Sequence, residues 1–303
     1  MKKALSITWS VAEPLLALWA FLFVLPIALG QNGIWETAFA ENAVLKMTLY
    51  TVLMTHLTIA AMSICFHRAH THQAIKLHPA VDAAMQIWLW LTTSMAKLDW
   101  VSIHVYHHTT SDTEKDPHSP KQKGLARIFF FGVYDYVVAK SDPEVMKIRK
   151  RIPENRLESF IDKHHLLGPI LTAAILGILF GPSKGMLLAG LTFLISPFFA
   201  VGGVNGFAHY FGYRNHRTTD NSRNLGFVFP LNWMISGELD HNNHHAFPRS
   251  ASFSHRWYEF DIGYAYITLL KWVGLCEVKH VYRRRKEAVL DSVPVAVQVA
   301  KLG

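Results

Sequence analysis

Histidine is the residue type whose number and spacing indicate chemistry in this sequence. The chain holds 18 histidines, nearly as many as its 22 Asp and Glu residues together. Most of them lie in four short segments, here called histidine boxes: HRAHTH at 67–72, HVYHH at 104–108, NGFAHYF at 205–211 and HNNHH at 241–245. Because imidazole is the side chain that most often binds metals, these boxes predict a metal site.

The two HxxHH boxes carry the strongest signal. Positions i, i+3 and i+4 of a helix share one face, with Cβ atoms about 5–6 Å apart, so their imidazoles can converge on metal. A single HxxHH is more often an exposed polar helix face, but two copies together with HxxxxH favour a metal site. The candidate ligands are His67, His72, His104, His107, His108, His209, His241, His244 and His245.

The number of candidate ligands limits the choice of metal. Imidazole suits Zn, Cu, Fe and Ni, but a catalytic zinc usually has only three protein ligands. Nine imidazoles are too many for one metal and crowded for two zincs, so they favour two iron ions with four or five nitrogens each. The Glu and ExxH ligands of soluble ferritin-like di-iron proteins are absent. The two cysteines, Cys65 and Cys276, offer neither a disulfide framework nor a cysteine-based zinc site.

The elements that position these boxes are predicted to be membrane helices. Half of the chain is hydrophobic, and an α-helix needs roughly 20 apolar residues to cross about 30 Å of hydrocarbon. A weaker apolar segment, 81–98, is expected to be an interfacial or buried helix that ends at the second box. The GPSKG turn predicts that the last two spans form a hairpin. The four expected spans are about Pro14–Gly30, Ala43–Phe66, Leu166–Phe180 and Gly185–Phe207.

The basic residues predict the orientation of these spans. Of 30 Lys and Arg residues, only Lys46 and Lys184 lie in the two short connectors 31–46 and 181–185. The positive-inside rule then places both termini and all histidine boxes in the cytoplasm. We therefore expect a multi-pass protein of the inner (cytoplasmic) membrane whose net charge of +8 meets anionic lipids and not nucleic acid. A cleaved signal peptide is the alternative for residues 1–30.

The set HRxxxH, HxxHH, NxxxH and HNNHH resembles the membrane fatty acid desaturases. The stretches DPHSP, GYRN, HNNHHAFP and RWYEFDIG resemble especially the bacterial Δ9-type branch, and the similarity runs from about His56 to Leu275. The resemblance implies an all-α integral membrane fold, with four transmembrane helices under a cytoplasmic histidine-rich di-iron cap. It implies a single desaturase domain over 1–280 and a basic tail over 281–303.

The resemblance also implies roles for residues in the boxes. The nine histidines would be the iron ligands, and Asn205 would hold one iron through a water. Glu238 is the acid expected to hydrogen-bond a ligand histidine from behind, although Leu239-Asp240 replaces the Gly-Trp that many members have there. The acids that flank the boxes and could serve in this way are Asp99, Asp112, Glu114, Asp116, Glu238 and Asp240.

The activity implied is O2-dependent desaturation of a saturated fatty acyl chain at Δ9, with no catalytic residue beyond the metal site. The sequence has no haem, flavin or Rossmann segment, so electrons would come from a separate ferredoxin-like or reductase partner. Ser102 and Ile103 replace an Arg-Asp pair of the animal acyl-CoA enzymes, which leaves acyl-CoA and phospholipid open as substrates. An alkyl-chain hydroxylase of the same superfamily is the nearest alternative. A metal transporter would need histidines at midplane depth, where only His56 is expected.

Residues outside the boxes have simpler interpretations. His118 in DPHSP is expected to be a surface, turn or interfacial residue, and a turn is favoured because two prolines flank it. His70 occupies none of the family's ligand positions. The tryptophans that could shape an acyl tunnel are Trp88, Trp90, Trp100, Trp233 and Trp257.

Overall fold

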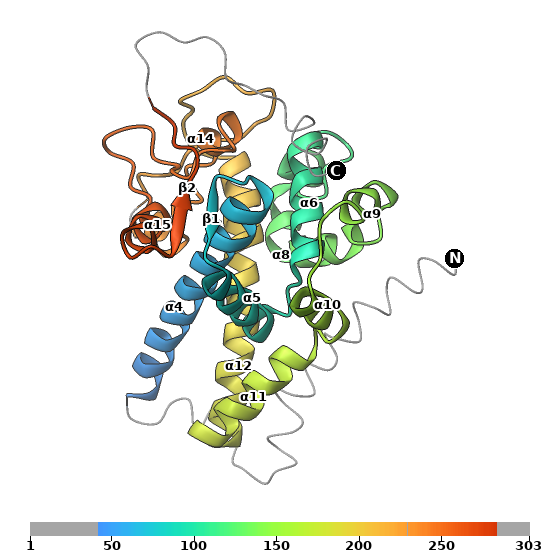
Figure 1. Ribbon diagram of the computed structural model, residues 1–303, viewed down its shortest axis with the longest axis vertical. Coiled ribbons are helices and arrows are strands. Elements are labelled where there is room, and N and C mark those ends of the chain that lie inside the picture. Colours follow the sequence, from blue (N-terminus) through green and yellow to red (C-terminus); the bar gives the residue numbers. More distant parts are fainter. Residues whose placement is uncertain (1–41, 229, 284–303) are drawn as a thin grey trace.

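The computed structural model describes residues 42–228 and 230–283, which form a mostly helical molecule with one two-stranded sheet (Figure 1). The expected first span, 14–30, lies outside the described residues, as does the tail from residue 284 onward. Long helices extend toward one end of the molecule, whereas the histidine boxes and most short elements gather at the other (Figure 1).

The second expected span is longer than its apolar stretch. Helix α4 (Ala43–Ala61) continues into a π-helix, η2 (Met62–Thr71), and the two form one candidate membrane span over Val44–Thr71. The first box therefore lies largely within the helix and not after it. The His72 N–H donates to the carbonyl of His67 at 3.1 Å, so residues five apart are aligned here, as the π-helical hydrogen bond requires.

The last two expected spans form the predicted hairpin. Helix α11 (Leu167–Phe180) turns at Gly181, whose φ is +84°, into α12 (Pro182–Pro197). The latter continues through η3 (Phe198–Gly206) and η4 (Phe207–His209), so that 182–209 is a second candidate span. Helix α11 is long enough to span only together with α10 (Arg156–Lys163), to which it is bent by 78°. The described residues thus contain two candidate spans, or three with this bent pair.

The weaker apolar segment is two helices, which corrects the expectation of one. Helix α5 (Pro79–Thr93) ends at Ser94, which has a left-handed φ of +62°. After the extended Ala96, α6 (Lys97–Thr110) begins and carries the whole second box. The second box therefore lies on a separate helix, α6, which does not continue α5.

The remaining helices and the two strands complete the end of the molecule that holds the boxes. Helices α7 (Pro120–Lys123), α8 (Leu125–Ala139) and α9 (Pro143–Arg149) follow α6. Strand β1 (Ile75–Leu77) pairs antiparallel with β2 (Cys276–Val278) and ties the chain after the first box to its C-terminal part. In the sequence, three helices follow η4 and precede β2. They are α13 (Leu231–Met234), α14 (His241–Ala246), which carries the last box, and α15 (Ile262–Trp272).

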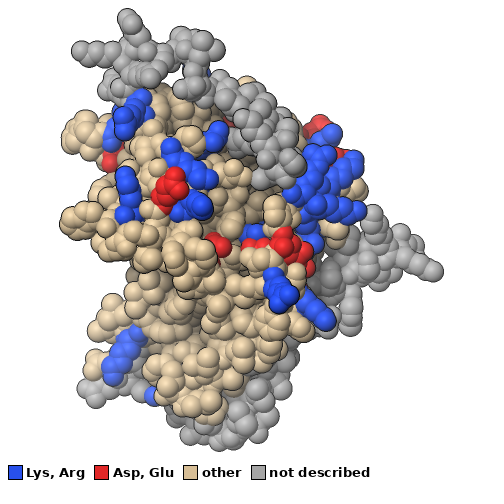
Figure 2. Space-filling view, viewed as in Figure 1, with Lys and Arg blue, Asp and Glu red and all other residues tan. Residues whose placement is uncertain are grey.

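The distribution of surface residues fits a membrane protein. On the face in Figure 2, most charged side chains lie over the end with the short elements, and the end formed by α4, α11 and α12 is mostly uncharged. Exposed large apolar side chains recur on this uncharged end, as a lipid-facing surface requires. Those of α4 and α11 are Val44, Leu45, Leu49, Val52, Leu53, Leu57, Leu167, Ile170, Leu171, Ile175, Ile178, Leu179 and Phe180.

Candidate metal centre

Five imidazoles form the first histidine cluster. One ring nitrogen of each lies within 4.8 Å of those of the others. Adjacent Nε2 atoms are in hydrogen-bond contact: His67 with His244 at 3.0 Å, His244 with His108 at 2.9 Å, and His108 with His104 at 3.1 Å. The members, from η2 and the residue after it, from α6 and from α14, are His67, His72, His104, His108 and His244.

Four imidazoles form the second histidine cluster beside the first. Their nearest ring nitrogens again lie within 4.8 Å of one another, and the Nε2 atoms of His241 and His245 are 3.1 Å apart. The His107 and His209 rings have centroids 5.2 Å apart. The members, from α6, η4 and α14, are His107, His209, His241 and His245. All nine sequence-predicted histidines thus fall in one cluster or the other.

Each HxxHH helix supplies both clusters, a division that the spacing alone did not indicate. On α6, His104 and His108 face the first cluster and His107 the second. On α14 the division is reversed, with His244 in the first cluster and His241 and His245 in the second. Residues i and i+4 point in nearly the same direction along a helix, so each i, i+4 pair stays together and the third imidazole turns to the neighbouring cluster.

The donor set in both clusters fits metal ions. Several buried ring nitrogens have no partner among the described residues, including both of His72 and the Nε2 atoms of His107 and His209. Two ligand nitrogens each about 2.1 Å from one ion lie roughly 3.0–3.4 Å apart at common coordination angles, close to the Nε2 separations observed. Burial lowers the pKa of His72, His104 and His108 well below 6.5, so these rings are neutral at physiological pH, the form that binds metal.

A carboxylate holds the outward nitrogen of four of these rings. The Nδ1 atom of His67 contacts Glu238 at 2.9 Å, and the corresponding contacts are His107 with Asp116 at 2.9 Å, His209 with Asp112 at 3.0 Å and His245 with Asp220 at 2.8 Å. A carboxylate behind a histidine is typical of metal sites, because it fixes the tautomer and the ring orientation. The Nε2 lone pairs are thereby directed into the clusters.

Three of these acids flank a box and were candidates from the sequence, whereas Asp220 was not. It lies in the loop between η4 and α13, 25 residues before His245. The other flanking acids do different work: Asp99 pairs with Lys140 and Arg149, Glu114 is exposed, and Asp240 accepts from Asn232 at 3.2 Å.

The two asparagines of HNNHH anchor α14, a role that sequence analysis missed. The Asn243 Nδ2 atom donates to the Phe253 carbonyl at 2.7 Å and to Glu259 at 2.8 Å. The backbone N–H of Asn242 donates to Asn224 Oδ1 at 2.8 Å. All three asparagines are fully buried, so these contacts fix the short helix and with it the directions of its three histidines.

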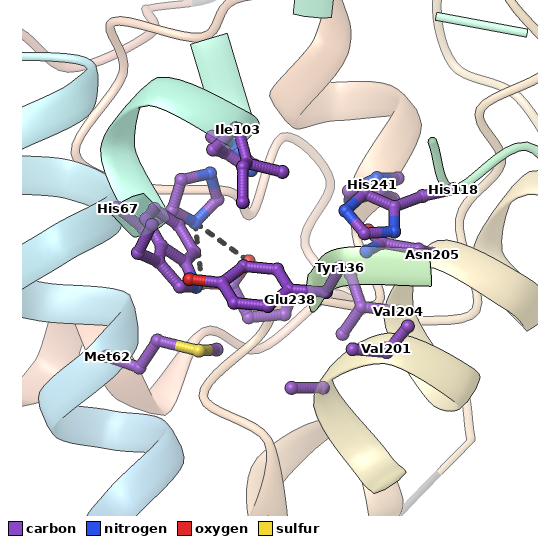
Figure 3. A pocket seen from close by; sticks show the side chains of 13 residues that line it. Met62, His67, Ile103, His118, Tyr136, Val201, Val204, Asn205, Glu238 and His241 are labelled. Carbon is purple, nitrogen blue, oxygen red and sulfur yellow. Dashed lines mark hydrogen bonds and ion pairs between the residues drawn. The ribbon is translucent and has the colours of Figure 1, made fainter. Parts of the chain in front are cut away.

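A cavity with a largely apolar wall adjoins both clusters (Figure 3). His67 and His104 of the first cluster and His241 of the second border it, as does Asn205 of η3. Of the five tryptophans considered from the sequence, only Trp100 lines it, where it stacks on His104 at 4.6 Å. The apolar part of the wall consists of Met62, Ile103, Ala200, Val201 and Val204.

His118 lines this cavity too, so the expected turn is confirmed but a surface position is not. It is only 4% exposed, although it does lie in a turn. Its backbone N–H donates to Asp116 Oδ1 at 2.9 Å, within the turn. Its ring belongs to neither histidine cluster. Tyr136 contributes a buried hydroxyl to the same wall, with no hydrogen-bond partner among the described residues.

His56 has a structural environment away from the cavity. Its Nδ1 atom contacts the Met234 carbonyl at 2.9 Å, and its Nε2 atom contacts the Tyr266 hydroxyl at 2.7 Å. With both nitrogens engaged, the ring joins α4 to α13 and α15.

Comparisons with known proteins agree with this geometry. Residues 43–267 match the family model described as fatty acid desaturase. The chain is 30% identical over 213 residues to an sn-1 stearoyl-lipid 9-desaturase of Anabaena variabilis, covering 69% of this chain and 75% of that protein. It is 28% identical over 237 residues to the Delta-9 acyl-lipid desaturase 2 of Arabidopsis thaliana, covering 76% and 74%. An icosanoyl-CoA 5-desaturase of Limnanthes douglasii is 31% identical over 223 residues, covering 72% and 60%.

Proposed function

Because this chain belongs to the fatty acid desaturase family, an oxidoreductase family that acts on fatty acyl chains, we propose that it introduces a Δ9 double bond into a saturated acyl chain. Two iron ions would be held by the nine histidines of the two clusters, with Asn205 as a ligand through water. The observation that carries the proposal is a pair of buried all-imidazole clusters beside a cavity with an apolar wall.

The overall reaction sets what must be supplied to this centre. Two hydrogens leave adjacent methylenes, and O2 takes these with two further protons and two electrons to give the alkene and two waters. When bound, the irons would supply the redox chemistry that activates O2. We propose a separate ferredoxin-like or reductase partner as the electron donor, in keeping with the lack of a haem, flavin or Rossmann segment in the sequence.

The protein's own contribution is to choose the carbon atoms that react. A saturated chain has no group to ionise or hydrogen-bond, so its reacting carbons can be selected only by shape. Met62, Ile103 and Val204 would pack against the chain, while His67 and His241 border the same space. Glu238 and Asp220 keep the Nδ1 protons of His67 and His245 away from the clusters.

We propose an acyl chain already esterified in a membrane lipid as the substrate. Ser102 and Ile103, which replace a polar pair of the animal acyl-CoA enzymes, are 0% and 1% exposed, and Ile103 lines the cavity. Neither presents a charge to a phosphate-bearing headgroup. The Anabaena and Arabidopsis relatives are acyl-lipid enzymes by name, although the Limnanthes relative is named for an acyl-CoA.

We further propose a multi-pass protein of the inner membrane, with the histidine boxes and both termini in the cytoplasm. The support is the uncharged, apolar end formed by α4, α11 and α12, opposite the charged end that carries the clusters (Figure 2). This arrangement places the metal centre next to the acyl chains and within reach of a cytoplasmic electron donor.

Expression in a bacterium with defined fatty acids tests the function. We expect new monounsaturated acids with the double bond at carbon 9, absent from cells that carry His107→Ala. A hydroxylated product would instead support the hydroxylase alternative and refute desaturation. Purified enzyme with an electron donor, offered stearoyl-CoA and the matching phospholipid in separate reactions, tests the substrate, and turnover of the CoA ester alone would refute the lipid proposal.

A further inference from the structure

A third group of metal-ligating side chains lies on the far side of η2 from the histidine clusters. Cys65 and His70 of η2 and Asp82 of α5 each offer a donor atom within 4.8 Å of the others. The Cys65 thiol donates to Asp82 Oδ1 at 3.3 Å, and His70 Nε2 contacts the same oxygen at 2.7 Å. Neither Cys65 nor His70 belongs to a histidine cluster.

The π-helical register explains why these residues meet. In an α-helix, residues five apart point in directions that differ by roughly 140°, but a π-helix aligns residues i and i+5. This alignment brings His67 and His72 together in the first histidine cluster. The same register aligns Cys65 with His70. These two residues each lie two positions before His67 and His72, so they point toward α5 instead.

The donor set suits a zinc-class divalent ion. A thiolate, an imidazole and a carboxylate are the ligands that zinc takes, and a site with three protein ligands keeps a fourth position for water. Side chains His70 and Asp82 are 26% and 21% exposed, so an ion can arrive from solvent, while Cys65 is fully buried. Gln86 Nε2 donates to the other oxygen of Asp82 at 2.9 Å and holds the carboxylate in place.

We propose that Cys65, His70 and Asp82 form a third metal site, which takes one zinc-class ion with water as its fourth ligand. Binding replaces the hydrogen bonds to Asp82 Oδ1 with bonds to the metal. The thiol proton leaves to solvent, and the neutral His70 ring takes the tautomer that carries its proton on Nδ1, which frees Nε2 for the metal. The ion ties η2 to α5 at positions that alternate with His67 and His72, so it steadies the segment that supplies two ligands to the first cluster. This proposal does not depend on desaturase activity.

Cobalt(II) added to the full-length, iron-loaded protein in detergent is the direct test. A cobalt–thiolate bond gives a near-ultraviolet charge-transfer band that imidazole and carboxylate ligands cannot give. We expect this band to saturate at one cobalt per chain and to be removed by excess zinc. Cobalt that enters the histidine clusters produces no such band, so the readout is independent of the function proposed for them.

Substitutions assign the band to its ligands. We expect Cys65→Ser to abolish it, and His70→Ala and Asp82→Asn to shift the titration to higher cobalt while leaving the thiol in place. Cys276→Ser is the matched control, because Cys276 is the only other cysteine and lies on β2, and it should leave the band unchanged. Absence of a charge-transfer band in the wild-type protein, or its persistence in Cys65→Ser, would overturn the proposal.

Discussion

Four carboxylates determine which nitrogen of their histidine faces a cluster. Burial alone would raise the pKa of Asp112, yet its contacts with His209 and Ser119 lower that pKa to about 2. The acid is therefore ionised at any physiological pH and holds the proton on His209 Nδ1. Burial lowers the pKa of His241 and His244 far below 6.5, so these neutral rings are ready to bind metal without competition from protons.

Asp220 gives a test of these supporting contacts. Replacing Asp220 with Asn leaves the ligands in place but removes the charge that orients His245, and we expect metal affinity to fall about 10- to 100-fold. Iron retained after dialysis against a chelator measures this loss. Glu144→Gln is the control, since Glu144 is exposed and pairs with the exposed Lys147; equal iron retention in the two variants would argue against the role of Asp220.

Substitution of His118 tests whether this residue lines the cavity or binds metal. We expect His118→Ala to keep its full metal content, because its ring is in neither cluster, and to yield a wider mixture of double-bond positions as the cavity opens beside the substrate. Metal analysis and mass spectrometry of the products measure the two effects. Loss of metal in this variant would instead make His118 a ligand.

The spacing of histidines identified the members on the two HxxHH helices, because helix periodicity decides which side chains share a face. The choice of His67 and His72 over His70 came instead from the family resemblance, since residues five apart meet only in the π-helical register found here. Spacing did not identify Asp220 as the acid behind His245, because the two residues lie 25 positions apart and meet through a loop. The turn at His118 was predicted from DPHSP, but its burial was not, because turn composition does not show whether the turn packs against other elements. Such contacts depend on tertiary structure that no local pattern records.

At the scale of elements, apolar length predicted the helices but not where they end. The second expected span was placed at 43–66, yet the helix runs on to Thr71 as a π-helical stretch, which places His67 and His72 in one cluster. The break between α5 and α6 was missed, since Ser94 adopts a left-handed conformation that its residue type does not demand. The hairpin of α11 and α12 was predicted correctly from its Gly-Pro turn.

Two glycines of this hairpin provide a matched test of its packing. A Cβ added at Gly185 would lie 2.3 Å from the backbone nitrogen of Gly177, whereas one added at Gly177 would meet nothing within 4 Å. We expect Gly185→Ala to lower the free energy of unfolding by about 1–3 kcal/mol through overpacking. Gly177→Ala should be neutral or stabilising by up to about 1 kcal/mol, since Ala favours helix. Thermal unfolding in detergent compares them, and equal stabilities would show that the helices are not in close contact.

At the scale of the whole molecule, one end is apolar and the other is charged and contains both histidine clusters. Both clusters lie where η2, α6, η4 and α14 meet, and these elements come from distant parts of the sequence. The cavity that they enclose borders α12 through its continuation η3, which supplies Ala200, Val201 and Val204.

The proposed topology is checked with reporter fusions in a bacterium. We expect fusions after Lys121 and Gly303 to report the cytoplasm and a fusion near Gln31 to report the opposite side, because Lys and Arg are concentrated in the segments assigned to the cytoplasm. A periplasmic signal after Lys121 would place the histidine boxes on the wrong side of the membrane for a cytoplasmic electron donor.

The number and ligands of the metals in the purified protein test the central claim most directly. We predict two irons per chain by elemental analysis and X-ray absorption spectra dominated by imidazole nitrogens. His72→Ala should deplete the iron of the first histidine cluster, and His209→Ala that of the second, so that each falls toward one iron per chain and loses desaturation. An active wild-type enzyme with one iron or none, or an iron shell dominated by carboxylate oxygen, would contradict this account.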